Sequence, residues 1–556
     1  MLKNDLILFS KNLINTVLKE KDNLKINGIS IFIKNDSNKN YEEDYFLSGK
    51  IINLASYLAC HSKNEEDINN LKSLIKFTYN LPLKTWGILN YLLGLIRLKG
   101  NNLLDSVLTK DELNFLNKKL HYNTFVDNNL NLINLPTNYY GVAFGVSKFR
   151  EILNFENNNM STKFLNKLLT HIKTYTNESY FMDETNGDGR YDRYSLLIAC
   201  ELCSHLLNGH TKIDEFIISM LKESSKVFLF LSNKDGNGFQ YGRSIGAYGD
   251  TASGQVLSIA ARLNILSDDE KNLAYSYNLN GLKKYLNFWI DKNMNQVNLM
   301  FKGRKTDKYR HLRRSLGESF SLTLQWFDIL DNYDFCNNLK IININNEENM
   351  KFLKFKKNRA SFFYKNNNYV LSLPMISGGN SYYSNPSYLP SFQSNLLFEP
   401  SPDVDIPMFY PYLIKDNKEY VFAHYIKSID YNNNNINLVF NKYLEVGKKS
   451  INVSYSNELD IQYYIDNLLL EINYHVLNFE FEYAKIIFPL FEEIDSINDN
   501  IIYFKSNKYK ALELINYKSI KLIDITNDDK FKTNHGTYKT YIEVLFSNNF
   551  GYKFHF

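Results

Sequence analysis

The sequence predicts an N-terminal (α/α) toroid of helical hairpins followed by a C-terminal antiparallel β-sandwich, and three observations carry this prediction. The chain has 556 residues, and a domain usually holds roughly 100–200 residues, so more than one domain is expected. Apolar residues follow a helical period up to about residue 335. Beyond residue 350 they follow a period near two. We therefore expect a helical domain at 1–335, a linker at 336–350 and a β domain at 351–556.

Helical periodicity runs through the whole first part of the chain. The first 21 residues form an amphipathic pattern, because Lys and Asn interrupt the apolar residues at helical spacing. The further segments with apolar residues at i, i+3, i+4 and i+7 are 47–61, 66–79, 85–98, 139–154, 163–175, 191–207, 213–231, 252–265, 270–290 and 315–331. So many helices fit a toroid of paired helices. A compact bundle or a solenoid is the alternative, although no clean repeat of roughly 34 residues appears.

The second part of the chain reads as antiparallel strands rich in Tyr, Phe, Val and Ile, separated by Asn-rich turns. The clearest strand segments are 360–374, 419–431, 435–446, 468–483 and 500–506. Most of the prolines fall between Pro374 and Pro411, and Pro cannot donate to a sheet ladder. We expect an irregular excursion there. Its tyrosines, which are Tyr382, Tyr383, Tyr388 and Tyr410, would be able to lean over a cleft in the helical domain.

The composition is that of an ordinary globular protein and excludes several functions. Apolar residues make up 44% and charged residues 22%, as in typical soluble domains. The net charge of +4 is well short of the basic character of nucleic-acid-binding proteins, so no nucleic-acid partner is expected. No stretch approaches the roughly 18 apolar residues of a membrane span, and the N-terminus lacks the apolar core of a signal peptide. We expect a cytoplasmic protein without membrane contact. The sequence does not indicate an oligomeric state.

Two residue types allow more than one interpretation. The 41 tyrosines can stack on sugar rings while their hydroxyls form hydrogen bonds, although the bias of an AT-rich genome and strand propensity also account for them. The 4 cysteines are too few for a disulfide framework. Cys200 and Cys203 lie inside a helical pattern, which favours core packing over redox or metal chemistry.

The segment LPTNYYGVAFGV places polar and aromatic residues at the start of an expected helix. Asn138 and Tyr139 lie where helix N-termini would line the mouth of a cleft. The alternative is that Asn138 or Thr137 only caps the helix.

The segment DETNGDGRYDRYS contains a turn-rich loop from Asp183 to Gly189. The loop lacks the ligand spacing and the final Glu of a calcium loop, so no metal is expected. The charged and aromatic residues that follow it are Arg190, Asp192, Arg193 and Tyr194. They form either a ligand-binding cluster or a solvated ion-pair face.

The segment KDGNGFQYGRSIGAYGDTASGQ is the most informative in the chain, because five glycines fall between Gly236 and Gly249. Gly permits positive φ and a close approach of the backbone to a ligand. Tyr241, Arg243, Tyr248 and Asp250 lie among or directly after these glycines. The spacing does not match a phosphate-binding loop, which excludes a nucleotide site. A purely structural loop remains the alternative.

A basic stretch, KGRKTDKYRHLRRSLGESF, closes the helical domain and contains Arg310, His311 and Arg314. Such a cationic strip beside a Tyr-rich loop suits an anionic ligand, unless it is only a solvated helix face.

In three of these segments the chain resembles the α/α-toroid polysaccharide lyases, and more closely an uncharacterised lyase-like family called domain of unknown function 2264. The matching stretches are NYYGVAFGV (138–146), DGRYDRYS (188–195) and YGRSIGAYG (241–249). The resemblance implies a helical toroid with a cleft, a β domain after it, and an acidic oligo- or polysaccharide as substrate. The chain departs from the family at Tyr139, where Trp is commoner, and it lacks the His–Tyr pairing of the chondroitin and hyaluronan lyases.

The lyase interpretation requires groups that neutralise a uronate carboxylate while a base removes the C5 proton and an acid protonates the leaving oxygen. Tyr can be both acid and base when a neighbouring cation lowers its pKa from about 10. We expect Tyr248 in this role, with Tyr241 as second choice, and Asn138, Arg243 and His311 as neutralisers. The scheme requires no metal or other cofactor. The further substrate-binding candidates are Tyr139, Arg190, Asp192, Tyr194, Tyr241, Asp250, Arg310 and Arg314.

Two other functions fit the same segments. A glycoside hydrolase would use a carboxylate pair, either Asp183 or Asp188 with Asp250. A carbohydrate-binding or scaffold protein would use the Tyr and Arg residues for binding without chemistry.

Overall fold

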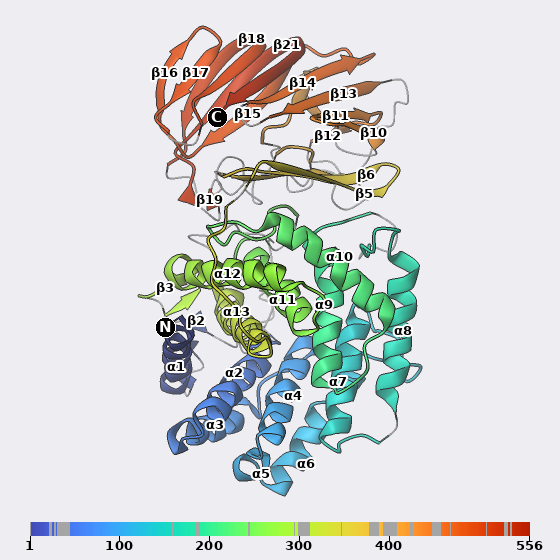
Figure 1. Cartoon of the computed structure of the whole chain (residues 1–556), viewed down its shortest axis with the longest axis vertical. Coiled ribbons are helices and arrows are strands. Elements are labelled where there is room, and N and C mark those ends of the chain that lie inside the picture. Colours follow the sequence, from blue (N-terminus) through green and yellow to red (C-terminus); the bar gives the residue numbers. More distant parts are fainter. Residues whose placement is uncertain are drawn as a thin grey trace.

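The chain folds into a helical domain and a β domain, stacked along the long axis of the molecule (Figure 1). The computed structural model describes residues 2–21, 25–26, 29–30, 45–157, 159–183, 189–242, 245–293, 295–297, 312–345, 347–367, 369–376, 389–392, 408–422, 426–446, 457–466, 469–506, 509–526, 532–533 and 536–556. None of the helices in these ranges combines the length and the apolar character that a membrane crossing requires.

Six helices form a closed inner ring in the helical domain. They are α2 (Leu47–Ser62), α4 (Thr85–Gly100), α7 (Tyr139–Ile152), α9 (Arg193–Asn208), α11 (Ala247–Arg262) and α13 (Leu312–Tyr333). Each packs against the next in this order, and α13 packs back against α2. The predicted fold class, a toroid of helical hairpins followed by an antiparallel β-sandwich, is confirmed.

Outer helices alternate with the inner ones along the chain and pack against the outside of the ring. They are α1 (Leu2–Glu20), α3 (Glu65–Thr78), α8 (Met160–Tyr175), α10 (Glu215–Leu231) and α12 (Asp268–Lys284). The described part of this domain also contains four short helices, α5 (Leu104–Val107), α6 (Lys110–Lys119), η2 (Tyr122–Thr124) and η3 (Tyr285–Trp289). It contains four two-residue strands as well, β1 (Lys25–Ile26), β2 (Ile29–Ser30), β3 (Ile290–Asp291) and β4 (Gln296–Val297).

Several helices begin where the sequence supplies a capping side chain. Asn64, Asp192 and Asp214 each accept a hydrogen bond from a backbone N–H in the first turn of α3, α9 and α10. Thr109 and Ser267 open α6 and α12 with complete capping boxes. Such caps satisfy N–H groups that have no partner inside the helix and fix where each helix starts.

Glycines set the close spacing of α2 and α4. A Cβ atom at Gly49 would lie 1.9 Å from the Gly87 carbonyl oxygen, and one at Gly87 would lie 2.3 Å from the Tyr45 carbonyl oxygen. Farther along, a Cβ at Gly94 would lie 3.2 Å from Cα of Asn53. The two backbones are therefore in contact, and this contact holds the neighbouring residues of both helices at one end of the ring.

The β domain contains two antiparallel sheets that enclose a second hydrophobic core. The smaller sheet has the order β5 (Asn349–Lys356), β6 (Arg359–Lys365), β7 (Val370–Met375). The larger sheet contains β8 (Tyr412–Lys415), β9 (Lys418–Val421), β10 (Ile426–Asn432), β11 (Asn435–Phe440), β12 (Leu444–Glu445), β13 (Glu458–Ile465), β14 (Leu469–Leu477), β15 (Tyr483–Leu490), β16 (Ile494–Asn498), β17 (Ile501–Phe504), β18 (Ala511–Asp524) and β21 (Thr540–His555). A separate pair is formed by β19 (Lys532–Thr533) and β20 (Gly536–Thr537).

The smaller sheet lies between the helical domain and the larger sheet (Figure 1). Its strand β6 is buried at every position except the last, Lys365, and so is covered on both faces. Phe362 and Tyr364 enter the core of the β domain, whereas Phe363 joins the core of the helical domain. Phe355 of β5 stacks on Tyr191, with ring centroids 4.5 Å apart. The two domains therefore share a continuous apolar contact through this sheet.

The proline-rich segment is described only in part, and Tyr382, Tyr383 and Tyr388 lie outside the described residues. Tyr410 is fully buried in the β domain, where its hydroxyl donates to the carbonyl of Phe422. This tyrosine therefore does not reach the helical domain. Pro374 lies in β7, an edge strand of the smaller sheet, where a missing N–H is tolerated.

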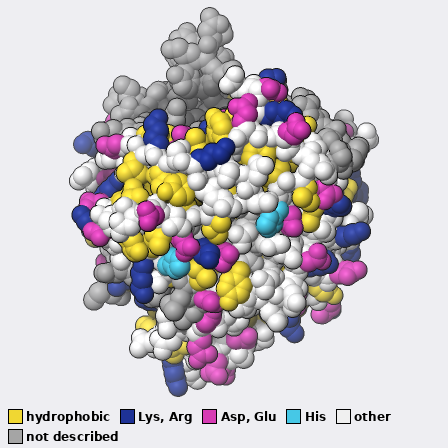
Figure 2. Space-filling view, turned by 90° about the horizontal axis from the view of Figure 1, so that it is seen from above, with side chains coloured by type: hydrophobic (Ala, Val, Ile, Leu, Met, Phe, Trp, Pro, Cys, Tyr) yellow, Lys and Arg dark blue, Asp and Glu magenta, His cyan; other side chains and the backbone are white. Residues whose placement is uncertain are grey.

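Viewed from the β-domain end, basic and acidic side chains are interspersed over the surface (Figure 2). No patch of a single sign dominates this face, in agreement with the modest net charge of +4.

Candidate active site

The inner ring of helices surrounds a cavity of ≈ 420 Å³, which we call the axial cavity. All six inner helices contribute to its wall. The lining residues from the N-terminal parts of these helices are Lys50, Trp86, Asn138, Tyr139, Arg193, Tyr194, Tyr248 and Glu318, and we call this set the rim. Helix N-termini carry partial positive charge from unpaired N–H groups. The rim therefore favours an anionic ligand.

Tyr248 lies at the centre of the rim, in the first turn of α11. Its hydroxyl donates to the Glu318 carboxylate, which comes from α13. Lys50 of α2 donates to the same carboxylate oxygen over 3.2 Å. The Lys50 and Glu318 side chains are only 5% and 4% exposed. A phenol, a carboxylate and an ammonium thus form one buried chain of interactions across three helices.

Arg193 supplies a second cation beside Tyr248. Its Nη1 atom donates to the backbone carbonyl of Tyr248 over 3.0 Å. Its guanidinium carbon lies 5.5 Å from the Tyr248 ring centroid and 4.4 Å from that of Tyr194. The Nε atom of Arg193 is buried and has no hydrogen-bond partner among the described residues. The guanidinium is held by aromatic faces and one carbonyl.

Aromatic rings occupy the opposite part of the rim. Trp86 of α4 and Tyr139 of α7 meet edge to face, with ring centroids 6.5 Å apart at 69°. Asn138 directly precedes Tyr139 and also lines the cavity. All three side chains are only partly buried. Such rings suit the apolar faces of sugars, whose hydroxyls then point to polar neighbours.

The far part of the axial cavity is polar and contains an ion pair. Arg97 lies 3.5 Å from Asp328 and also donates to the Asn53 side chain. Burial raises the pKa of Asp328 to about 6, although the charge of Arg97 opposes this shift. Half of the Asp328 side chain, 50%, is nevertheless open to solvent. A carboxylate deep in the protein that stays accessible must face the cavity.

Several residues predicted for the site lie elsewhere. Asp250 bonds to Lys284 over 2.9 Å and accepts from the Trp289 ring N–H over 3.0 Å, both outside the axial cavity. Tyr241 is buried between the domains, where its hydroxyl lies 2.6 Å from the Ser361 hydroxyl. Burial raises the pKa of Tyr241 far above its usual range. Neither residue is among those that line the cavity.

The loop before α9 also has structural contacts. Asp192 caps α9 by accepting from the Tyr194 N–H, and Arg190 lies 3.9 Å from the Asp192 carboxylate. Asp183 accepts from the Gly189 N–H over 2.7 Å and lies 3.7 Å from the Lys356 ammonium. Arg243, His311, Arg310 and Asp188, together with the side chain of Arg314, lie outside the described residues.

Sequence reasoning missed Lys50, Trp86 and Glu318 and gave Arg193 no specific role. The available signal was a charge within an apolar helix, since Lys50 is the one charged residue in LSGKIINLASYL and Glu318 the one in SLGESFSLTL. Charged residues are seldom fully buried unless they are paired or functional. The pattern did not indicate that these two would meet.

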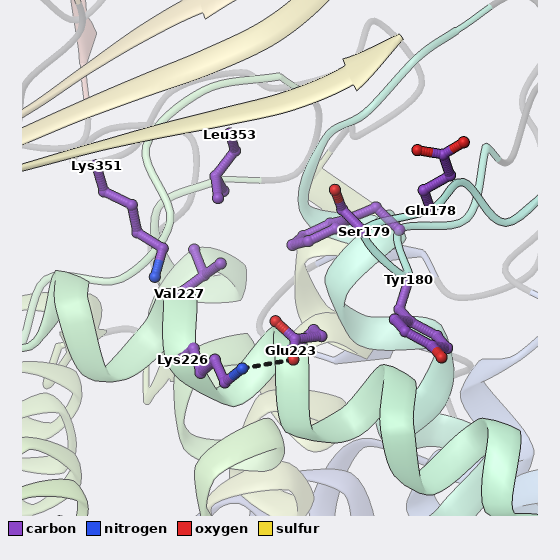
Figure 3. Close-up of a pocket in the computed structure, with 9 residues that line it drawn as sticks. Glu178, Ser179, Tyr180, Glu223, Lys226, Val227, Lys351 and Leu353 are labelled. Atoms are coloured by element: carbon purple, nitrogen blue, oxygen red, sulfur yellow. Dashed lines mark hydrogen bonds and ion pairs between the residues drawn. The ribbon is translucent and has the colours of Figure 1, made fainter.

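A second, smaller cavity of ≈ 260 Å³ lies where α10 meets the edge strand β5 (Figure 3). Lys351 and Leu353 of β5 reach down toward it, and Lys226 pairs with Glu223 on α10 over 2.6 Å. It shares no lining residue with the axial cavity. It is also smaller, with contributions from one helix, one strand and one loop, so the axial cavity, which all six inner helices line, is the stronger candidate for chemistry.

No protein-family model and no curated protein matches the chain. Among solved structures, chondroitin AC lyase of Streptomyces coelicolor A3, in complex with chondroitin sulphate, matches with a TM-score of 0.53 and 7% identity. The match covers 99% of this chain and 79% of that chain. This chain shares its fold with a polysaccharide lyase.

Two further lyases match with lower scores and carry no additional argument. A chondroitinase AC lyase gives a TM-score of 0.46 at 9% identity and covers 100% of this chain and 82% of its own. A mutant of heparan sulfate lyase HepC from Pedobacter heparinus gives 0.36 at 10% identity and covers 98% and 82%.

Proposed function

We propose that this protein is a lyase that cleaves uronic-acid-containing oligo- or polysaccharides by β-elimination, with Tyr248 as the acid/base residue. The observation that carries the proposal is the position of the Tyr248 hydroxyl in the axial cavity, bonded to Glu318 and flanked by Lys50 and Arg193. The shared fold and the three sequence stretches that resemble domain of unknown function 2264 point the same way.

The reaction moves one proton and breaks one carbon–oxygen bond. The C5–H bond breaks, its electron pair becomes the C4=C5 double bond, and the leaving oxygen takes the pair of the C4–O bond. The C5 proton passes to Tyr248 and from there to the leaving oxygen, so that no water is consumed. Tyr248 must first lose its own proton to become a base, and Glu318 is the acceptor to which it already donates.

Positive charge at the rim serves both anions of this scheme. Lys50 and Arg193 stabilise a phenolate at Tyr248 and the extra negative charge that builds on the uronate carboxylate. Asn138 lines the same part of the cavity and adds an amide donor. We retain Arg243 and His311 as further neutralisers on sequence grounds.

Substrate binding would rest on two groups of residues. Trp86, Tyr139 and Tyr194 would stack on sugar rings at the rim. Arg310 and Arg314 stay candidates for neighbouring acidic sugars on sequence grounds, whereas Arg190 is buried beside Asp192 and does not line the cavity.

Hydrolysis is the second candidate, favoured by the carboxylates that line the axial cavity. Asp328, whose pKa is raised to about 6, has the character of a general acid. Glu201 would then supply the second carboxylate of a hydrolase. This interpretation replaces the pairs built on Asp250, which lies outside the cavity.

The test follows ultraviolet absorbance during incubation with a panel of uronic-acid glycans, because elimination creates an absorbing unsaturated uronate. We expect the band to grow with wild type and Tyr248→Phe to slow it by about 10²–10⁴-fold, as for loss of a general acid or base. Tyr277→Phe is the matched control, since its buried hydroxyl donates to the Asn237 carbonyl outside the cavity. Reducing ends without the band would instead establish hydrolysis, in which case Asp328→Asn should abolish turnover. Absence of both products would contradict either enzyme.

A further inference from the structure

The axial cavity continues well beyond the rim along the ring axis. On α13 its lining runs from Glu318 to Asn332, and on α9 from Arg193 to Asn208. At 1.5 Å per residue, either stretch spans about 21 Å or more. The sugar whose bond reacts at Tyr248 occupies only the rim end of this length. The remainder, which we call the chamber, is lined by Arg97, Glu201, His205, Asn208, Gln325 and Asp328.

The closed ring limits how a glycan can reach the chamber. Each inner helix packs against its neighbours and α13 closes on α2, so no lateral gap admits the middle of a chain. A saccharide enters the space inside the ring only by an end. An end of the glycan must therefore pass the rim before any of its sugars can occupy the chamber.

Charge differs between the two parts of the axial cavity. Among the described lining residues, the rim has two cations, Lys50 and Arg193, against the single carboxylate of Glu318. The chamber reverses this balance, with two carboxylates, Glu201 and Asp328, against Arg97. Arg97 is moreover already bonded to Asn53 and Asp328. A uronate carboxylate is attracted to the rim and repelled from the chamber.

The chamber nevertheless offers polar atoms that need partners. His205 is only 8% exposed, and its Nδ1 atom has no hydrogen-bond partner in the described part of the chain. The same holds for the buried Oε1 atoms of Gln255 and Gln325. Burial lowers the pKa of His205 to about 4, so its ring is neutral and carries no charge that would attract an anion. Sugar hydroxyls donate and accept, and they suit the uncharged amide side chains of Asn208 and Gln325 that line the chamber.

We propose that the chamber binds an uncharged terminal sugar, so that the protein removes a product of fixed size from chain ends. This inference rests on the proposed function, because it places the terminal sugar next to a uronate held at the rim. The substrate class is then an acidic glycan that carries a neutral residue at the end that enters the ring.

The first experiment separates products by size during digestion of a uronic-acid polymer and of size-defined oligosaccharides, while the unsaturated-uronate band is recorded. We expect one small product of constant size from the earliest time, with the average polymer length falling slowly. A mixture of internal fragments at early times, accompanied by the band, would overturn the chamber assignment and leave the elimination intact. Absence of the band would contradict the proposed function instead.

The second experiment tests the chamber by itself. Gln325→Leu should raise KM at least about tenfold for neutral-ended oligosaccharides and change kcat little, because a lost hydrogen bond of about 1.4 kcal/mol corresponds to a factor of ten. Asn208→Leu should raise KM in the same way. Asn208 is exposed at the end of α9, so this substitution is not expected to disturb folding. Gln462→Leu, at an exposed position in β13, is the matched control.

A binding measurement gives an answer even without turnover. Neutral mono- and disaccharides at millimolar concentration are titrated into wild type and Gln325→Leu, followed by ligand-detected NMR. Binding that wild type shows and Gln325→Leu loses supports the chamber as a neutral-sugar site. Equal binding by both proteins, or binding by neither, overturns it.

Discussion

Lys50→Met removes one partner of the ion pair that joins the first and last inner helices. Lys50 and Glu318 are almost fully buried, so the substitution removes the ammonium group that compensates the buried carboxylate. Loss of one partner from a buried pair costs about 3–5 kcal/mol. Glu318 keeps the hydrogen bond from Tyr248, which places the expected loss of unfolding free energy near about 3 kcal/mol at pH 8.

The double variant Lys50→Met with Glu318→Gln buries no charge at this position and should cost less than either single variant.

Urea denaturation at pH 8 measures all four proteins of this cycle, with the elimination assay run alongside. Lys351→Ala, in the smaller cavity between α10 and β5, is a lysine control that should leave elimination unchanged. A cost below about 1 kcal/mol for Lys50→Met would refute the reasoning, because solvent-exposed ion pairs contribute only this much.

Two further predictions concern the geometry and charge of the axial cavity. Gly49→Ala should lower the free energy of unfolding by about 1–3 kcal/mol and slow turnover, because its Cβ would lie 1.9 Å from the Gly87 carbonyl oxygen and push Lys50 away from α4. Thermal melts should distinguish this variant from Gly100→Ala, whose Cβ meets no atom within 4 Å. Gly100→Ala should be neutral or slightly stabilising. Asp328→Asn should match wild type in stability near pH 4 and exceed it at pH 8. A folded-state pKa of about 6, above the usual 3.8 of an Asp side chain, means that ionisation weakens the fold as the pH rises through this window. Because half of the side chain is exposed, 50%, we expect a gain of only about 1 kcal/mol, and no gain at pH 8 in pH-resolved melts would contradict the shift.

The helices could be predicted from apolar periodicity, whereas the role of the glycines near Tyr248 could not. The expected helix at 252–265 begins earlier, at Ala247, directly after Gly246 with its φ of 76°. Gly249 and Gly254 lie inside α11, where a Cβ would come within 2.4 Å of Phe239 and Ile329 respectively. They serve helix packing, although glycines clustered in a sequence usually indicate a turn.

This change of secondary structure also decides which candidates reach the cavity. Tyr248 and Asp250 were expected in one ligand-binding loop. On a helix, residues two apart point about 200° away from each other, at 3.6 residues per turn. Tyr248 faces the axial cavity, and Asp250 consequently faces Lys284 and Trp289 on the opposite side. Because the segment is a helix and not an open loop, the Tyr248 and Asp250 side chains lie on opposite faces of α11.

The ion pair between Lys50 and Glu318 spans 268 positions of the chain, which bears on how the protein is made. Ribosomes add about 5–20 residues per second, so Lys50 waits about 13–54 s before Glu318 is synthesised. During this interval the ring lacks α13, and the faces of α2 and α11 that α13 covers stay open to other apolar surfaces. Nascent chains that end before α13 therefore lack the Glu318 carboxylate that accepts from Tyr248, and the proposed active site is completed only after the whole helical domain has left the ribosome.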